Sequence, residues 1–330
     1  MKRIASKMKK RNYGIDFLKF VAAIMITNSH FIPLYEDHNI SFATLGVHGN
    51  ALFFFVSGFF LTKIETSDGE YIKFDYWIKN KIIRLWPTLI VFFVFANLIF
   101  NKEISWHDFL LAGEYWFVRC FIISFSLIYF LIKFFKQYSK HILALSILIT
   151  FIIIFISPKV NGSIYHGFHY ICYFSSMMLG VSISLHRENI KTKNLLLDLS
   201  FCTFSFLLYF AIMVFGKGKT DYFYYTQLLA VFPLLSFLFY SYKVVSYSWC
   251  DKLATHKIWS IIFLIASLTY EIYIVQFSII TNDFNKWYPL NTLIVFILIV
   301  LSAYVLRILT NFFLRIFSNK VWDFKEIIRL

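Results

Sequence analysis

A short series of polar residues inside a mostly apolar segment is the first place where this chain could perform chemistry. Asp16, Lys19 and His30 lie within the segment 16–30, which is long enough to enter a bilayer. An ionisable group at the centre of a membrane helix costs about 2.5–3.5 kcal/mol on insertion scales, so such groups persist where they are paired or functional. Spacing of three residues puts Asp16 and Lys19 on one helix face, where they can pair. His30 lies about 16 Å further along the axis, and spacing alone fits an interfacial histidine as well as a base.

Four other apolar segments carry polar or amphipathic side chains that could take part in a site. They are His48 and Ser57 within 46–62, Arg84 before Pro87, Trp116 and Arg119 within 114–120, and Glu271 and Gln276 within 267–277. Spacing alone explains Arg84 best as an anchor that reaches the membrane surface. Arg119 interrupts an apolar segment, which favours a buried role beside substrate or a carboxylate. We expect Glu271 to neutralise a cation from another helix, with Arg307 and Arg119 as the candidates.

The composition predicts an all-α integral membrane protein. Of the 330 residues, 59% are hydrophobic, 22% aromatic and 15% charged, which excludes an ordinary soluble domain. The net charge of +14 does not indicate a nucleic-acid partner, because the basic residues fall in short segments between apolar ones. Cys120, Cys172, Cys202 and Cys250 have no paired spacing, so we expect neither a disulfide framework nor a metal site.

About ten transmembrane helices are expected, in a single polytopic domain over residues 1–330. The predicted spans are 15–35, 44–63, 83–100, 115–135, 142–157, 165–185, 197–215, 223–240, 259–280 and 290–314. Of the 32 lysines and arginines, 24 fall in, or within three residues of, alternate connecting segments and the chain ends, and 5 fall in the segments between them. The more basic side faces the cytoplasm. Both termini, the basic tail 1–14 and the tail 315–330, are therefore expected there.

The basic start of the chain is interpreted as the flank of an uncleaved first span, since no signal-peptidase-like site follows it. Residues 64–82 are predicted to form a cytoplasmic amphipathic segment. Within them, Tyr71–Ile83 mixes aromatic residues and lysines at helical spacing, which is typical of a helix that lies on the membrane surface.

Five motifs, taken in order, resemble those of one known family. D-F-L-K-F-V-A-A…H (16–30) is similar to D-x-L-R-G-x-A-A…H, F-F-F-V-S-G-F-F-L (53–61) to F-F-V-L-S-G-F-L-I, I-I-R-L-W-P (82–87) to R-I-x-P, Y-W-F-V-R (115–119) to W-F/Y-L/V-x-x, and S-L-T-Y-E-I-Y-I-V-Q (267–276) to S-Y-x-I-Y-L-x-H. The family is the membrane-bound acyltransferase family 3, which O-acylates sugars and other hydroxylated acceptors. The motifs span most of the chain and are densest over residues 11–120.

The resemblance implies an O-acyltransferase of the short type, without a soluble esterase-like extension. We expect acetyl-CoA, or another acyl-CoA, as co-substrate, with no bound cofactor and no metal. The acceptor would be a hydroxyl of a cell-surface carbohydrate or its precursor. The expected location is a bacterial plasma (inner) membrane, as a multi-pass protein whose partners are the bilayer, acyl-CoA and the glycan, without nucleic acid.

With an acyl transfer in view, we expect the following roles for individual residues. His30 would be the base or a transient acyl carrier, with Asp16 holding Lys19. The acyl donor would be bound by Lys19, Arg84 and Ser57. The acceptor or oxyanion would be contacted by Arg119, His48 and Trp116, and the polar residues of the ninth span are Glu271 and Gln276. Lys19 stands where the family usually has arginine, which loses the bidentate fork. Gln276 replaces a late histidine and cannot transfer protons, and Phe121 is nearest to a glutamate that many members carry.

Two other classes of membrane protein remain open. A transporter or flippase of lipid-linked or acylated sugar would suit ten helices with intramembrane charges. The chain shows no convincing repeat and no matching Gly- or Pro-broken halves, which argues against it. A polysaccharide polymerase would usually need a larger extracytoplasmic loop than this sequence offers.

Overall fold

The computed structural model describes residues 11–65, 69–100, 115–156, 165–216, 226–317 and 328. Over these residues the chain is helical, and a bridge between Glu65 and Tyr71 is the β-type pairing that occurs within them. The longer helices are α1 (Tyr13–Ser29), α2 (Gly46–Leu61), α3 (Phe74–Phe100), α5 (Trp116–Phe135), α6 (Ser139–Ile156), α7 (Tyr165–Leu185), α8 (Leu195–Gly216), α10 (Val231–Val245), α12 (Trp259–Ser267), α13 (Thr269–Ile279) and α14 (Leu290–Ile316). The all-α prediction is confirmed.

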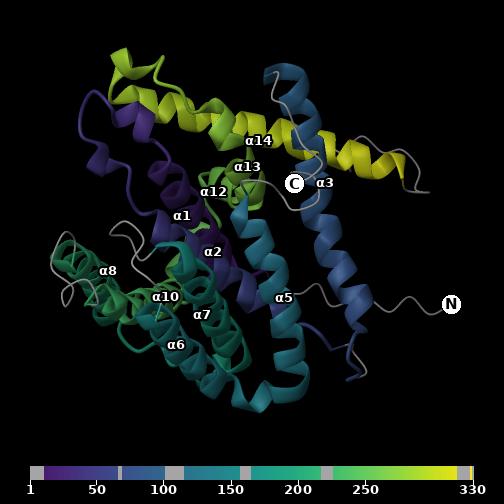
Figure 1. The fold of residues 1–330 in the computed structure, drawn as a ribbon, viewed down its shortest axis with the longest axis vertical. Coiled ribbons are helices and arrows are strands. Elements are labelled where there is room, and N and C mark those ends of the chain that lie inside the picture. The colour runs from purple at the N-terminus through teal and green to yellow at the C-terminus, as the bar shows by residue number, and fades with distance from the viewer. Residues whose placement is uncertain are drawn as a thin grey trace.

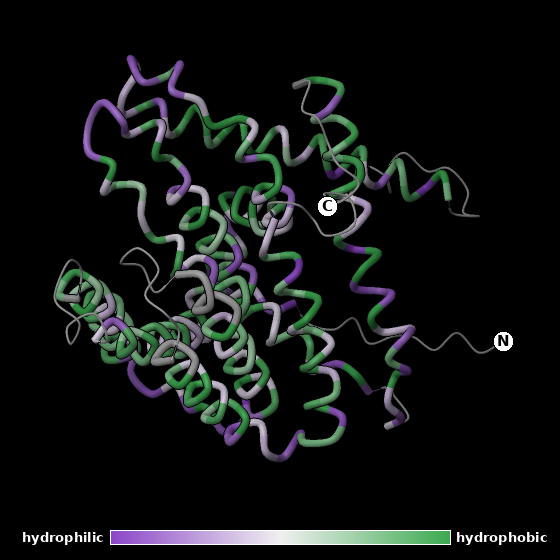
Figure 2. The backbone as a smooth tube through the Cα atoms, in the orientation of Figure 1, coloured by the Kyte–Doolittle hydropathy of each residue, from purple (hydrophilic) through white to green (hydrophobic). Residues whose placement is uncertain are grey.

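Each predicted span overlaps a helix, but the count of ten membrane crossings is not confirmed. Six helical segments of the described chain are long and apolar enough to cross a membrane, or seven if α12 and α13 form one span. The difference has simple causes: α1 has 17 residues, and α5 and α6 are separated only by the short turn Lys136–Tyr138. Figure 1 shows α5 descending to that turn and α6 rising from it. Apolar residues cover the helices, while polar residues gather in the connecting segments (Figure 2).

The predicted surface helix Tyr71–Ile83 is not a separate element. Residues 71–73 are not helical, and the residues from Phe74 onward are the first turns of α3, which continues through Pro87. Trp77 is buried whereas Tyr76 is exposed, so the expected two-sided character is present in the first turns of the long helix.

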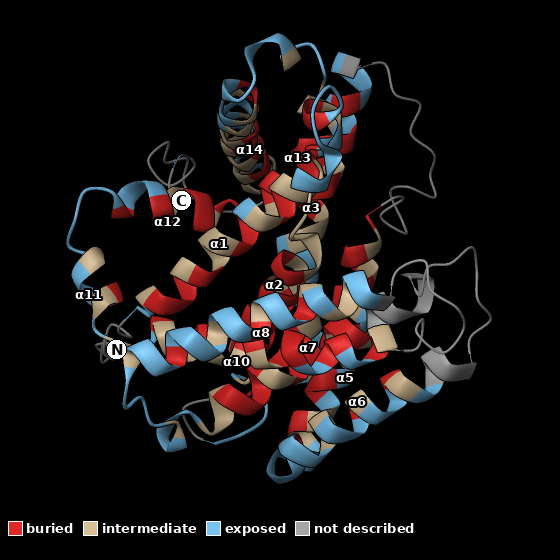
Figure 3. Ribbon diagram, turned by 90° about the vertical axis from the view of Figure 1, so that its left-hand side faces the viewer, coloured by how far each residue is buried: buried red, intermediate tan, exposed pale blue. Residues whose placement is uncertain are grey.

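Helix α2 lies at the centre of the molecule and packs between α7 and α1. It crosses α7 at two glycines: a Cβ on Gly58 would lie 2.0 Å from the Met177 carbonyl oxygen, and a Cβ on Gly180 would lie 2.0 Å from that of Phe55. Small residues let helix backbones approach this closely in membranes. Figure 3 shows α2 and α7 largely buried, while α6 and α8 present exposed faces.

The ninth predicted span is broken in two. Helices α12 and α13 meet at 76°, and Leu268 between them is fully buried. Helix α12 begins beside the start of α1, where the Tyr13 and Trp259 rings are 5.4 Å apart. Helix α13 then follows α1 toward its other end, and this placement brings its side chains to the last turn of α1.

Candidate active site

His30 is the C-cap of α1 and faces α13. Its backbone N–H donates to the Thr27 carbonyl over 3.0 Å. The imidazole centroid lies 4.6 Å from the Phe277 ring and 6.3 Å from the Tyr273 ring. His30 is half-buried, so its ring has an apolar wall on one side and remains accessible on another. A histidine so placed can exchange a proton with a bound hydroxyl.

Polar contacts hold the connecting segments beyond His30. The Asn28 amide donates to the Phe42 carbonyl (2.8 Å) and the Thr44 carbonyl (3.2 Å), and accepts from the Tyr35 hydroxyl (2.9 Å). Asn285 donates to the Pro33 carbonyl over 3.0 Å. These contacts fix the chain that follows α1 against both α2 and the segment before α14, and so fix the end of α1 itself.

Helix α13 is held by hydrogen bonds to three neighbouring helices. The Tyr115 hydroxyl at the start of α5 donates to the Ile274 carbonyl (3.0 Å), and the Tyr270 hydroxyl donates to the Leu85 carbonyl of α3 (2.8 Å). Arg307 of α14 donates to the Ser267 carbonyl at the helix break (2.9 Å). An eleven-residue helix is short for independent stability, so these contacts place the wall beside His30.

Glu271 pairs with Arg307, as one of the two alternatives predicted. Arg307 Nη2 donates to Glu271 Oε2 over 3.0 Å, and Nε lies 2.8 Å from Oε1 as an ion-pair contact. Arg119, the other candidate, has a buried Nε that no described residue accepts from. Its guanidinium therefore retains hydrogen-bonding capacity on the helix that begins with Tyr115.

Sequence reasoning selected Trp116 but missed its neighbour Tyr115. Trp116 stacks on Tyr173 of α7 at 5.7 Å. Tyr115, by contrast, lies 6.3 Å from Tyr273 and 6.2 Å from Phe277, the two rings that contact His30. Its hydroxyl contact depends on how α5 and α13 are rotated, for which a single sequence carries no signal.

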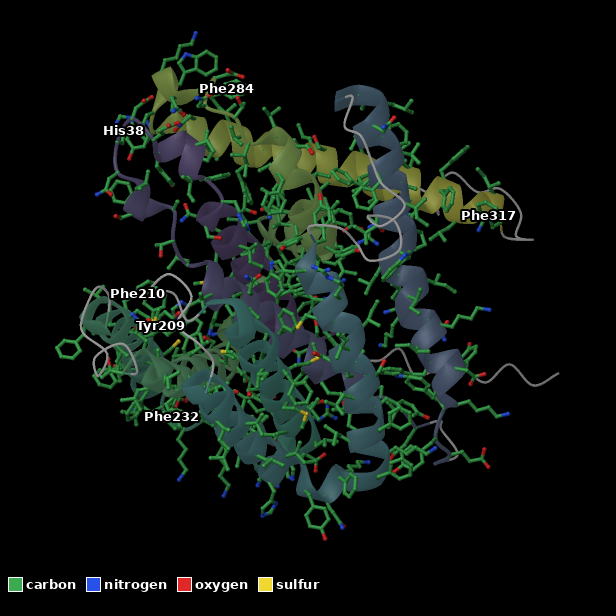
Figure 4. All side chains as sticks on the ribbon, viewed as in Figure 1. His38, Tyr209, Phe210, Phe232, Phe284 and Phe317 are labelled. Carbon is green, nitrogen blue, oxygen red and sulfur yellow. The ribbon has the colours of Figure 1, made fainter. Side chains whose placement is uncertain are left out.

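His48, predicted to act on the acceptor or oxyanion, has ring neighbours that differ from those of His30. Its ring lies among four aromatic rings of α8 and α10: Phe206 (4.8 Å), Tyr209 (4.4 Å), Phe210 (5.2 Å) and Phe237 (5.1 Å). It is fully buried, and neither ring nitrogen has a partner among the described residues. Figure 4 shows Tyr209 and Phe210 together on α8, apart from His38 and Phe284 at the top of the view.

The other end of α1 is polar and charged. Asp16 is 6% exposed and accepts from Lys19 over 3.4 Å, which confirms the predicted pair. It also accepts from Arg11 Nε over 2.5 Å, a contact that was not predicted. The Lys19 ammonium lies 5.2 Å from the centroid of the Phe60 ring at the end of α2.

A cavity of about 620 Å³ opens at this end of α1. It is lined by the start of α1, the end of α2 and the segment 184–189, which covers the last residues of α7 and those that follow, together with Lys136. Its charged and titratable lining residues are Arg11, Asp16, Lys63, Lys136, His186, Arg187 and Glu188. Basic side chains thus outnumber acidic ones, and an anionic group would be attracted here.

The three predicted donor-binding residues, Lys19, Ser57 and Arg84, lie outside the lining of this cavity. Arg84 is exposed and lies near enough to Lys81, as does Lys63, for their charges to interact, so it extends the basic surface beside the cavity. Ser57 donates to the Phe53 carbonyl of its own helix over 2.9 Å. Within the described ranges, no three His, Cys, Asp or Glu side chains are grouped to hold a metal ion.

Comparison with family models decides the class of this chain. The model of the acyltransferase 3 family, described as an acyltransferase domain, matches residues 12–308. This chain belongs to the acyltransferase 3 family. The comparisons with curated proteins and with solved structures gave no match. As an acyltransferase 3 protein with several helices able to cross a bilayer, it is a multi-pass membrane acyltransferase.

The match places both ends of α1 and all of α13 inside the acyltransferase domain. Gln276 lies on α13 between Tyr273 and Phe277 in sequence and is fully buried. Its amide has no partner in the part of the chain that the structure describes. This acyltransferase 3 domain thus brings His30, Tyr115 and α13 together and sets the basic cavity at the opposite end of α1.

Proposed function

We propose that this acyltransferase 3 protein transfers an acyl group, preferentially acetyl, from acyl-CoA to a hydroxyl of a cell-surface glycan or its precursor. The main support is that one helix, α1, has a basic cavity beside its first turn and His30 at its end. These are the two features that acyl transfer from a large anionic donor needs: a site for phosphates and a base at the reacting atoms.

The cavity at the start of α1 would hold the phosphate-bearing end of acyl-CoA. Ligand sites for small molecules have volumes of roughly 300–1,000 Å³, and about 620 Å³ lies within that range. Arg11, Lys63 and Arg187 line it, and arginine and lysine bind phosphate oxygens through charge-assisted hydrogen bonds. Lys19 and Arg84, which were predicted from the sequence to bind the acyl donor, add positive charge beside it.

The thioester would extend along α1 to His30, about 16 Å from Lys19 at about 1.5 Å per residue. His30 takes the proton of the acceptor hydroxyl as its oxygen attacks the thioester carbonyl carbon. The C–S bond breaks, the proton passes from the imidazolium to the leaving sulfur, and free CoA and an ester are the products. Arg119 would stabilise the developing oxyanion, because it lies on α5, the helix that begins next to Tyr115. Donor phosphates and acceptor would then meet α1 at different depths.

The test uses purified protein in liposomes with labelled acetyl-CoA and cell-envelope glycans. We expect acceptor-dependent release of free CoA from the wild type, and a loss of about 10²–10⁴-fold in kcat for His30→Gln, because general-base catalysis contributes roughly that much. The matched control is His38→Gln, whose ring packs against Tyr288 in a connecting segment. Full transfer by His30→Gln, or glycan movement without acyl transfer, would contradict the proposal.

A further inference from the structure

The three helices around His30 carry buried polar atoms that no described residue satisfies. These atoms are Thr27 Oγ1 on α1, Arg119 Nε on α5, and the Gln276 amide and Ser278 Oγ on α13. A buried polar atom without a hydrogen bond lowers the stability of the fold. Native proteins therefore rarely keep such atoms unless they have another use.

Two buried threonine hydroxyls on other helices are satisfied. Thr150 on α6 is 1% exposed and donates to the Ser146 carbonyl over 2.7 Å. Thr310 on α14 is 4% exposed and donates to the Leu306 carbonyl over 2.8 Å. Thr27 is 0% exposed and could make the same bond to its own helix. Its hydroxyl is instead unpaired within the described residues, so helix packing alone does not account for it.

Thr27 and Gln276 both lie next to the groups that meet at His30. Thr27 is one turn before His30 and therefore on a similar side of α1. Gln276 is one turn after Tyr273 and adjacent to Phe277, the two residues whose rings contact His30. Helices α1 and α13 pack against each other directly.

We propose that Thr27 and Gln276 bind the reacting groups, an assignment that rests on the proposed function. The Gln276 amide N–H donates to the thioester carbonyl oxygen and continues to do so as negative charge develops on it. The Thr27 hydroxyl hydrogen-bonds the acceptor hydroxyl that His30 deprotonates. Both groups are neutral, so they orient and stabilise without exchanging a proton. Substrate reaches them when side chains move aside at the edge of the α1–α13 interface, where Phe277 is 45% exposed.

The test measures stability and turnover in the same variants. Thr27→Val and Gln276→Met keep the approximate shape and remove the unpaired polar atoms. We expect an unchanged or higher melting temperature for each, and at least a tenfold fall in kcat with the KM for acetyl-CoA unchanged, because the phosphates bind at the other end of α1. Thr150→Val is the matched control: it removes a satisfied hydroxyl, so its melting temperature falls while its kcat stays at the wild-type value.

Other results would contradict the assignment of Thr27 and Gln276. If both variants melt lower, as Thr150→Val does, and both keep wild-type kcat, the two residues are structural and the assignment is wrong. Thr27→Val stands as an independent measurement if Gln276→Met does not fold. An active wild type with fully active variants overturns this assignment alone, whereas an inactive wild type overturns the proposed function and the assignment together.

Discussion

The two ends of α1 differ in how they treat charge. At the start, Asp16 accepts from both Arg11 and Lys19, and the neighbouring cavity is lined by further cations. At the end, His30 faces the neutral rings of Tyr273 and Phe277. Many cations can share the first end because water solvates them there. At the second end, a charged imidazole of His30 would lie beside apolar rings. Its charge would therefore cost free energy unless a bound substrate compensated it. One end therefore suits binding of an anion, and the other suits movement of a proton.

The largest effect on this contrast should come from the ion pair that holds α13. Glu271→Ala leaves Arg307 without its carboxylate, and breaking a buried pair costs about 3–5 kcal/mol. We expect about 3 kcal/mol, because the Arg307 side chain is 33% exposed. Transfer should be lost as well, since α13 would no longer seat its rings against His30. Chemical denaturation and CoA release measure the two effects.

A charge exchange controls that prediction. The double variant Glu271→Arg with Arg307→Glu should recover part of the stability lost in either single variant, because the pair is re-formed with opposite polarity. Binding of acetyl-CoA should be unaffected throughout. An altered affinity for the donor would mean that the two ends of α1 are not independent.

Reversing charge in the cavity should change the opposite kinetic parameter. Lys63→Glu and Arg187→Glu each remove a charged donor that lines the cavity, and a hydrogen bond to a charged group contributes about 1.5–3 kcal/mol. We expect a rise of about tenfold or more in the KM for acetyl-CoA, with kcat unchanged. Steady-state kinetics at saturating acceptor measure this, and a fall in kcat alone would remove the cavity from donor binding.

Ionic strength should affect the two ends of α1 differently, with a smaller effect than the charge reversals. The Debye length falls from about 10 Å at 0.1 M salt to about 3 Å at 1 M. The KM for acetyl-CoA should therefore rise severalfold over that range, while kcat at saturating donor stays nearly constant. A kcat that falls with salt would indicate exposed charges at the reacting end.

The smallest effect is expected at His48. Its ring lies among Phe206, Tyr209, Phe210 and Phe237, so His48→Phe replaces an unpaired buried imidazole by a ring that suits those neighbours. We expect a melting temperature a few degrees higher, measured by thermal unfolding. A loss of transfer comparable with that of His30→Gln would return His48 to the reacting end.

Local features of the chain were predictable from sequence. The spacing of Asp16 and Lys19 indicated their pair, apolar runs located the helices, and the choice of partners for Glu271 was narrowed to two arginines. Each of these depends on neighbours along one helix or on the rarity of charge in apolar sequence.

Contacts that depend on how helices are rotated against one another were not predictable. Tyr115 reaches the Ile274 carbonyl across the α5–α13 interface, and nothing in its own segment indicates this. The break between α12 and α13 falls at Leu268 without proline or glycine nearby. The cavity combines residues from α1, α2 and the segment 184–189, whose proximity only the fold establishes.

The glycine crossing of α2 and α7 has a consequence for motion. Because Gly58 and Gly180 bring the backbones together with no room for a Cβ, neither helix can slide or turn past the other without a steric collision. The pair therefore acts as a fixed frame on one side of α1. Helix α13 is short, bent away from α12 and held by individual polar contacts, so we expect movement next to His30 to occur on the α13 side of the bundle.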